Sequence, residues 1–361
     1  MKTRYLIIYL FSLLINIQLF ADETTKKISA KWEDINKDYQ VQIDIMHNQV
    51  LFAKPNSILT IDLASKVKTI SILEKVKPYA FEMKDQLVKI SLPSENKSIE
   101  VYLSLNNKEK IIFTILTAII DTNTNDGEIT FAGNTYLIGK YPPIPSNGKT
   151  NYFKEKYAPP KYFFIWNSLL EESAISKTMK YKDLVIQPDA EKPGLPRPPR
   201  ATQIFTLSYE TILNFEKIIE KSRLKTPFNK VTILSYYRTP EYNHSIGGST
   251  FSRHIYGDGI DWYIDEKPEN EEMDDLNKDG KMNPEDALSF VQSITTLVTN
   301  HEIEPCGTGV YFTKKGASLH YDSRGHLARW GSSETWWPDK DLPPWLLEIE
   351  KKVKETDKQK K

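Results

Sequence analysis

Between residues 27 and 140, apolar and polar residues alternate along the chain in short runs. A period of two places successive side chains on opposite faces of a strand, so each run is expected to form a half-buried β-strand. Clusters of Asn, Pro, Lys and Asp separate the runs, which favours an antiparallel sandwich or small barrel, an all-β domain over residues 22–140. A longer apolar run at 111–120 fits either a buried strand or a short helix. The alternating runs lie at 41–45, 58–63, 87–92 and 99–105.

Prolines are concentrated between residues 141 and 200, and the densest run is P-G-L-P-R-P-P-R at 193–200. Proline-dense segments favour extended, semi-rigid conformations without internal hydrogen bonds. We therefore interpret residues 141–200 as a Pro-rich linker that packs along the following domain.

Beyond residue 201 the apolar residues show the spacing of helices in some segments and the spacing of strands in others. Apolar residues spaced three and four apart at 212–219 indicate a helix, and the run V-T-I-L-S-Y-Y at 231–237 indicates a strand. A second helix is expected to start at Pro284, because proline suits the first turn of a helix. We place this second domain at 201–345 and a charged tail at 346–361.

The first residues predict the compartment. Lys2 and Arg4 precede an apolar run at 5–20, and Ala21 precedes two acidic residues, which is the pattern of a secretory signal. The run is shorter than the roughly 20 residues that a spanning helix needs, so we expect cleavage after Ala21, with an uncleaved anchor as the alternative. A signal peptide at 1–21 predicts an exported protein, periplasmic or in the cell envelope, with no stable membrane span after cleavage.

Charge and cysteine content narrow the classes of function. The chain has 48 basic and 48 acidic residues, and loss of the signal removes two basic residues and leaves a net charge of −2. This balance gives no indication of nucleic-acid binding. Cys306 is the only cysteine, so no intramolecular disulfide can form, and stability must come from hydrophobic cores and bound metals.

A short segment carries the clearest chemistry. His254 and Asp261 lie on either side of Gly257 and Gly259, and His320 follows further along the chain. Two imidazoles and one carboxylate form a three-ligand set suited to catalytic zinc with an open fourth position. Zinc lowers the pKa of a water bound there towards about 7, which allows attack on a peptide carbonyl. Three unrelated polar residues in loops would be the alternative explanation.

Arg238 stands at the end of the strand expected at 231–237, where a side chain is held rigidly. A tetrahedral intermediate needs a cation or a hydrogen-bond donor, and Arg238 supplies one. A proton must also reach the leaving amine, for which Asp322, His326 and His244 are candidates.

These residues occur in an order that resembles a known family, the zinc D-alanyl-D-alanine peptidases of the lysostaphin, D-Ala-D-Ala peptidase and hedgehog superfamily. The similarity covers about residues 201–335 and is strongest to the murein endopeptidase branch. It implies that His254, Asp261 and His320 are the zinc ligands and that Arg238 stabilises charge on the scissile carbonyl. The implied fold class is α+β: a zinc peptidase domain with a small antiparallel sheet flanked by helices, preceded by the all-β sandwich-like domain. The matching positions are Ser235-Tyr236-Tyr237-Arg238, Pro240, Tyr242-Asn243, Gly247-Gly248, Ser252, His254, Gly257, Gly259, Asp261, His320, Asp322 and Arg329-Trp330.

Two departures from the family pattern stand out. Gly259 occupies the place of an alanine, which we regard as a sterically harmless change. Members of other branches keep an acidic residue three positions, or a histidine two positions, before the last ligand, where this chain has Ala317 and Ser318. The murein endopeptidase branch lacks both the acidic residue and the histidine, so their absence does not indicate an inactive protein. It does leave the general base unassigned.

A second metal signal lies inside the same domain. The segment D-L-N-K-D-G-K-M-N-P-E-D at 275–286 has the spacing of an EF-hand or dockerin calcium loop, with Gly280 at the sharp turn. An acidic surface turn before a helix is the alternative. The expected calcium ligands are Asp275, Asn277, Asp279, the Lys281 carbonyl, Asn283 and Asp286.

The sequence thus predicts an exported zinc metallopeptidase, with calcium as a second metal, that hydrolyses peptide bonds in peptidoglycan stem peptides or crosslinks. A D,D-carboxypeptidase is the alternative within enzymes, because the choice depends on whether the substrate groove is open at both ends. The alternative from another class is a catalytically silent, metal-containing domain that binds cell-wall peptides.

Overall fold

The structure is a computed structural model, and it describes part of the chain. The described residues are 29–33, 35, 40–62, 67–73, 81–84, 87–94, 96–105, 109–120, 127–144, 153–185, 204–266, 270–313, 316–332 and 343–358. The predicted signal peptide at 1–21 lies outside them. Within the described part, no helix combines the length and the apolar content that crossing a membrane requires.

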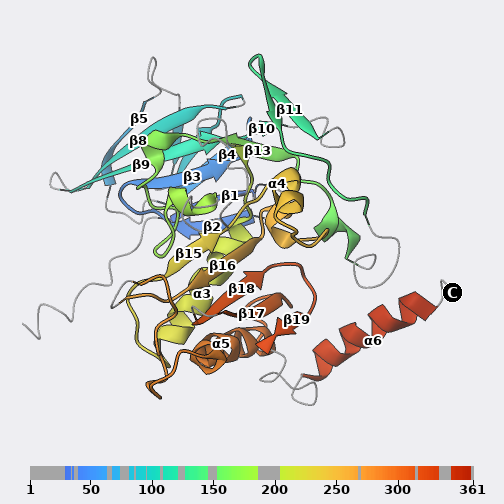
Figure 1. Cartoon of the computed structure of the whole chain (residues 1–361). Helices are drawn as coiled ribbons and strands as arrows, with labels where there is room; N and C mark the ends of the chain where they lie inside the picture. The colour runs from blue at the N-terminus through green and yellow to red at the C-terminus, as the bar shows by residue number, and fades with distance from the viewer. Residues whose placement is uncertain are drawn as a thin grey trace, which may run out of the picture.

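The alternating runs form two sheets on the N-terminal side of the molecule, coloured blue to cyan in Figure 1. In β7 the residues are alternately exposed and buried along the whole strand, as a period of two predicts. Neighbouring strands are antiparallel except β3 and β9, which are parallel. The five-stranded sheet has the order β2 (Gln40–Asp44), β1 (Ser29–Glu33), β4 (Ile58–Asp62), β7 (Leu87–Ser91) and β6 (Phe81–Lys84). The four-stranded sheet has the order β3 (Gln49–Ala53), β9 (Glu109–Thr117), β8 (Ser98–Leu105) and β5 (Val67–Leu73).

The apolar run at 111–120 is extended, which decides between strand and helix. It forms most of β9 and then β10 (Ile119–Ile120). A two-stranded hairpin of β11 (Glu128–Phe131) and β12 (Asn134–Leu137) follows.

Of the segment interpreted as a linker, residues 141–144 and 153–185 are described, and the proline-dense run at 193–200 lies outside the described residues. β13 (Tyr162–Ile165) lies between β10 and β14 (Ile204–Phe205), so one small sheet joins both halves of the chain. Short 3-10 turns at η1 (Lys154–Tyr157), η2 (Ser168–Leu170) and η3 (Tyr181–Leu184) flank β13. Phe164 and Tyr181 are buried among other aromatic rings, and burial of this kind holds residues 153–185 as part of the fold.

The C-terminal half forms a five-stranded sheet with helices, shown in yellow to red in Figure 1. Its strands are antiparallel except β17 and β19, which are parallel. Helices α3 and α5 contact each other and bury apolar residues such as Phe215 and Phe290 around Trp262 of the sheet. The strand order is β15 (Thr232–Ser235), β16 (Gly259–Tyr263), β18 (Gly316–Asp322), β17 (Gly307–Thr313) and β19 (Ala328–Gly331). The helical elements are α3 (Tyr209–Arg223), α4 (Pro240–Ser245), η6 (Arg253–Tyr256), η7 (Pro284–Ala287), α5 (Leu288–Thr299) and α6 (Pro344–Lys358).

Two features of the structure lie near the expected domain boundaries at 201 and 345. The parallel bridge between Val185 and Tyr237 adds a residue from before position 201 beside β15. The segment interpreted as a charged tail is helical through Lys358, and the ion pair of Lys352 with Glu348 one turn earlier supports the helix. The chain is therefore a mixed α and β protein with small sheets and few helices, consistent with the predicted α+β class.

A buried hydrogen bond connects the N-terminal sheets to the C-terminal half. All five residues of β3 are buried, and the backbone N–H of Phe52 donates to the hydroxyl of Tyr209 on α3 at 2.7 Å. Both residues belong to one hydrophobic core that contains apolar side chains from both halves. The two halves therefore share buried surface.

Candidate metal centre

The C-terminal sheet carries one row of residues that crosses all five strands. In the strand register, Ser235 pairs with Asp261, Asp261 with His320, and His320 with Gly309. Gly309 in turn pairs with Trp330 at the edge of the sheet. Because paired residues in neighbouring strands share a face, two of the predicted metal ligands come from adjacent positions in this row.

The third ligand reaches the row from a loop. His254 lies in the short turn η6, which ends at Gly257 in the left-handed region with φ of 71°. A Cβ atom at this position would lie 2.7 Å from the carbonyl oxygen of Thr206, so glycine is required for both conformation and space. The turn brings the His254 ring over the start of β16.

A buried ion pair fixes the same turn. The guanidinium of Arg253 donates to both carboxylate oxygens of Asp258, from Nε at 2.9 Å and from Nη2. The cation also lies over the rings of Tyr157 and Tyr256, at 4.8 and 4.4 Å from their centroids. Charge and aromatic contacts thus hold the residue next to His254 in place.

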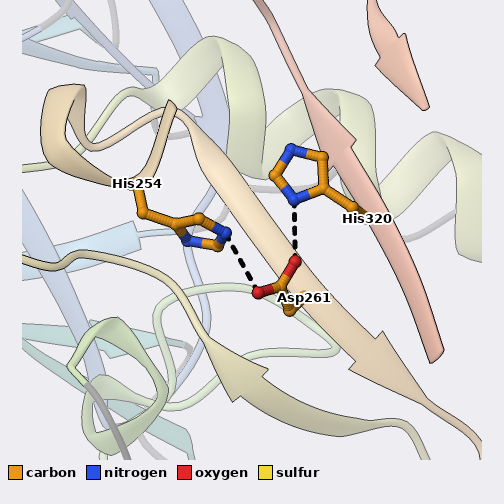
Figure 2. A group of neighbouring side chains, drawn as sticks. All are labelled: His254, Asp261 and His320. Atoms are coloured by element: carbon orange, nitrogen blue, oxygen red, sulfur yellow. Dashed lines mark hydrogen bonds and ion pairs between the residues drawn. The ribbon is translucent and has the colours of Figure 1, made fainter. Parts of the chain in front are cut away.

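The two histidines converge on the carboxylate of the third ligand, Asp261 (Figure 2). His254 Nε2 lies 3.0 Å from Asp261 Oδ2, and His320 Nδ1 lies 2.7 Å from Asp261 Oδ1. One ligand atom from each residue lies within 4.8 Å of the others. Both histidines are buried, and the side chain of Asp261 is 15% exposed, so the group is open to solvent only at the carboxylate.

The hydrogen-bond partners of the two rings determine which nitrogen faces the centre. His254 Nδ1 donates to the backbone carbonyl of Tyr236 at 2.6 Å, which leaves the lone pair of Nε2 for a metal. His320 Nε2 lies 2.9 Å from Asp322 Oδ2 and donates to it, which leaves the lone pair of Nδ1. Metal-bound histidines in proteins have such an acceptor on their second nitrogen. The donor set therefore fits a zinc ion held by Nε2, Nδ1 and a carboxylate oxygen.

The protonation states also suit a cation. Burial and the charge of Arg238 lower the pKa of His254, which favours the neutral imidazole that ligates metals. Burial opposes ionisation of Asp261, but the charges and hydrogen bonds of His254 and His320 hold its pKa well below the ordinary value. Burial likewise opposes protonation of His320, yet hydrogen bonds to Asp261 and Asp322 raise its pKa overall. Asp261 thus carries a negative charge that a bound cation would neutralise.

Arg238 reaches the same carboxylate from the other side. Its Nη2 donates to Asp261 Oδ2 at 2.7 Å, and its Nε donates to Ser235 Oγ at 2.9 Å. Its backbone N–H donates to the His254 carbonyl at 3.2 Å. The structure therefore brings the predicted arginine to the predicted ligands, with its guanidinium fixed at one edge of the site.

The three candidate proton donors lie in different settings. Asp322 is fully buried and accepts hydrogen bonds from His320, Arg324 and the backbone N–H of Gly307. These bonds make Asp322 a group that orients His320 rather than one that meets a leaving amine. His326 is buried, with Nε2 at 3.0 Å from the hydroxyl of Tyr157 and Nδ1 at 3.3 Å from the Leu327 carbonyl oxygen.

His244 is the accessible candidate of the three. It lies in the last turn of α4 and is exposed. Helix α4 begins directly after Arg238, with Thr239 accepting a capping hydrogen bond from the Tyr242 N–H. His244 is therefore tied to the segment that carries the arginine.

The space around Gly259 bears on the one residue of the ligand loop that departs from the family pattern. A Cβ atom on Gly259 would lie 3.2 Å from His320 Cε1 and 3.2 Å from the Arg253 Cβ atom. At contacts of 3.2 Å the neighbouring groups would have to move by only a few tenths of an ångström to admit an alanine. Glycine gives the His320 ring its present room.

The predicted calcium loop has the turn that its spacing implies, but its carboxylates accept hydrogen bonds from the loop backbone. Asp275 accepts from the N–H groups of Asp279 and Gly280, and Asp286 accepts from those of Leu276 and Asn283. Gly280 has φ of 83°, as the sharp turn requires. Among the described residues, His254, Asp261 and His320 form the one group of three such side chains whose ligand atoms converge. The expected calcium ligands also include amide and carbonyl oxygens, so calcium binding by 275–286 stays a prediction.

Several residues at the site have roles that the sequence does not show. Tyr236 contributes through its backbone carbonyl, and Arg324 holds Asp322 through two hydrogen bonds, with Nε to Oδ1 at 2.7 Å. Tyr311 lies beside Trp330, whose Nε1–H donates to its hydroxyl at 2.8 Å. Strand register links these residues to the ligands, and register between distant strands is not visible in a linear pattern.

Fold and geometry together define a metal-binding centre of two histidines and one aspartate, with an arginine alongside, on the face of a small sheet. In a comparison with protein families, residues 177–284 match the model of the family described as Peptidase M15. This match confirms the resemblance to the zinc D-Ala-D-Ala peptidases and supports a peptidase. It includes His254, Asp261 and Arg238, and it ends before His320. Comparisons with curated proteins and with solved structures give no match.

Proposed function

We propose that this protein is an exported zinc metallopeptidase that hydrolyses peptide bonds in peptidoglycan stem peptides or their crosslinks. The observation that carries the proposal is the convergence of His254, Asp261 and His320, with the second nitrogen of each histidine held by its own acceptor. Zinc bound to this set supplies Lewis acidity and activates water near neutral pH. The family match at 177–284 supports the peptidase class, and the peptidoglycan substrate rests on the resemblance.

The other steps of peptide hydrolysis are assigned to side chains around the ligands. Arg238 lies next to Asp261 and is placed to stabilise negative charge as it develops on the scissile carbonyl oxygen. Asp322 fixes the ring of His320, and the Tyr236 carbonyl fixes that of His254. His244 is exposed to solvent, and we assign the transfer of a proton to the leaving amine to it. These roles assign a binding, positioning or proton-transfer task to each predicted residue except His326, which contacts Tyr157 instead.

Incubation of the purified protein with crosslinked muropeptides, with and without a chelator, tests the proposal. Loss of crosslinked dimers that requires zinc and is abolished in His254→Ala supports an endopeptidase. Release of alanine alone supports the D,D-carboxypeptidase. The matched control is His301→Ala, because His301 stacks on Trp345 away from the ligand row. No turnover at full zinc occupancy would overturn both enzyme functions in favour of a silent, peptide-binding domain.

Export is supported by the N-terminal pattern of basic, apolar and small residues at 1–21. Fractionation of cells that express the full chain, with mass spectrometry of the mature N-terminus, tests cleavage after Ala21. Recovery of uncleaved protein in the membrane fraction would favour the anchor instead.

Calcium binding by 275–286 rests on the spacing of its residues alone. Calcium that binds only the folded loop would raise the melting temperature, and Asp279→Ala would remove the rise. Asp265→Ala is the control, since Asp265 is a buried acceptor outside the loop. An unchanged melting temperature at millimolar calcium would indicate a surface turn that its own hydrogen bonds stabilise.

A further inference from the structure

Tyr311 and Trp330 form an aromatic pair beside the ligand row. Gly309 pairs with His320, and Tyr311 is two residues further along β17, so its side chain lies on the same face of the sheet. Trp330 pairs with Gly309 from β19, and its ring centroid lies 5.1 Å from that of His320. The pair therefore borders the site on the side away from Arg238.

The ring of Trp330 is held in one place by its surroundings. A Cβ atom on Gly309 would lie 2.3 Å from Trp330 Nε1, so the indole lies directly across this glycine. The guanidinium of Arg324 lies 5.2 Å from the ring centroid on the Asp322 side. These contacts direct the indole N–H towards Tyr311, to which it donates at 2.8 Å.

This hydrogen bond leaves the phenol of Tyr311 as a hydrogen-bond donor. Because the tyrosine oxygen accepts from Trp330, its own O–H remains a donor. The tyrosine is 44% exposed, so a substrate can reach it. Burial of part of the ring and the nearby charge of Asp261 raise the pKa of Tyr311, which keeps the hydroxyl protonated at neutral pH. A neutral donor thus lies close enough to the site for the charge of Asp261 to act on it.

The scissile carbonyl oxygen at this site needs a hydrogen-bond donor in addition to Arg238. Arg238 donates one hydrogen bond to Asp261 and another to Ser235, and these two bonds restrict the movement of its guanidinium towards a substrate. We propose that Tyr311, oriented by Trp330, donates its hydroxyl hydrogen to the scissile carbonyl oxygen of the peptide as that oxygen gains negative charge. Tyr311 is then a catalytic residue and Trp330 a positioning residue. The inference rests on the proposed peptidase function.

Kinetics of the Tyr311→Phe variant test the inference. Loss of one oxyanion donor is expected to lower kcat by about 100-fold, with KM and zinc content nearly unchanged. Trp330→Phe keeps an aromatic ring but lacks the N–H, so we expect a smaller fall in kcat in the same direction. Two controls match the changes: Tyr102→Phe removes a hydroxyl bonded to Glu100 in the N-terminal half, and Phe312→Leu alters the exposed neighbour of Tyr311. Equal kcat values for Tyr311→Phe and the wild type would overturn the inference and leave the peptidase function intact.

A binding measurement separates this inference from the function on which it rests. A phosphinate analogue of a D-alanyl-D-alanine peptide carries the charge of the tetrahedral intermediate, and its affinity reports donors to that charge. Tyr311→Phe is expected to weaken its binding about 10- to 100-fold to the zinc-loaded protein. If the wild type binds the phosphinate but hydrolyses nothing, the peptidase function fails, and equal affinities of wild type and Tyr311→Phe would overturn the donor role as well. Failure of the zinc-loaded wild type to bind the phosphinate would overturn both.

Discussion

His320 and Asp322 are joined by a hydrogen bond of 2.9 Å from Nε2 to Oδ2, although only one residue separates them in the chain. Both residues lie on β18, so their side chains share a face, and the bond turns Nδ1 towards Asp261. His254 presents the other type of nitrogen, Nε2, because its Nδ1 donates to the Tyr236 carbonyl. The two histidines thus turn different nitrogens towards Asp261 and would bind one ion through them.

The Asp322 carboxylate is expected to control metal affinity. In Asp322→Asn the acceptor of the His320 N–H loses its charge, and Arg324 loses its ion-pair partner. Loss of such a partner lowers metal affinity by 10- to 100-fold in metalloproteins, and we expect a zinc Kd raised by about that factor. Competition with a chromophoric chelator measures it. Asp265→Asn is the control, because Asp265 accepts from loop N–H groups of the same domain; an equal loss there would indicate a general effect on folding.

Zinc affinity is also expected to depend on pH. The bonds to Asp261 and Asp322 outweigh burial and raise the pKa of His320, so a proton occupies the metal-free ring at a higher pH than for an ordinary histidine. Zinc must displace this proton, so affinity is expected to fall as pH decreases, by about tenfold per unit for one proton below that pKa.

Calorimetry in buffers of different ionisation enthalpy measures the released proton. Because Asp322→Asn removes one of the two groups that raise the pKa, its loss of affinity is expected to begin at a lower pH. A zinc Kd that is constant from pH 8 to 5.5 in the wild type would contradict this account.

Arg238 is expected to affect turnover more than zinc binding. Arg238→Ala removes a cation bonded to Asp261 but none of the three ligands, so we expect kcat to fall by about 100- to 1,000-fold with zinc retained. Arg238→Lys is expected to recover little, because one ammonium group cannot reproduce the fork that contacts Ser235 and Asp261 together.

Arg223→Ala controls for loss of a structural arginine, since Arg223 donates to the Phe228 and Asn229 carbonyls at the end of α3. Steady-state kinetics with metal analysis of each variant gives the comparison. Loss of zinc from Arg238→Ala in step with loss of activity would show that the arginine holds the ligand instead.

The ligands could be predicted from the sequence, but the strand pairing and the hydrogen-bond acceptors that position them could not. The spacing of His254 and Asp261 around two glycines pointed to a metal, because a loop and a strand start supply both residues within a few positions. The row from Ser235 to Trp330 depends on the pairing of five strands, and the choice between Nδ1 and Nε2 depends on acceptors that this pairing provides. Such relationships arise from register and cannot be read along the chain.

The Pro-rich segment shows a similar limit. Proline density predicted an extended connector for 141–200, and the described part at 153–185 is indeed mostly without long elements. Its buried aromatic residues decide its role, since Phe164 and Tyr181 pack around Phe52 and Phe205 from the two halves of the chain. Counting prolines does not show which side chains lie inside.

The bond between Tyr209 and Phe52 is expected to couple the two halves thermodynamically. In Tyr209→Phe the backbone N–H of Phe52 would remain buried without this acceptor, which costs about 1–3 kcal/mol of unfolding free energy. Because both residues belong to one core, we expect a single unfolding transition that shifts as a whole. Urea denaturation followed by tryptophan fluorescence and by circular dichroism measures it, and Tyr102→Phe serves as the partly exposed control. Two separate transitions, with the one that releases zinc unchanged in Tyr209→Phe, would show that the C-terminal half folds independently of the N-terminal sheets.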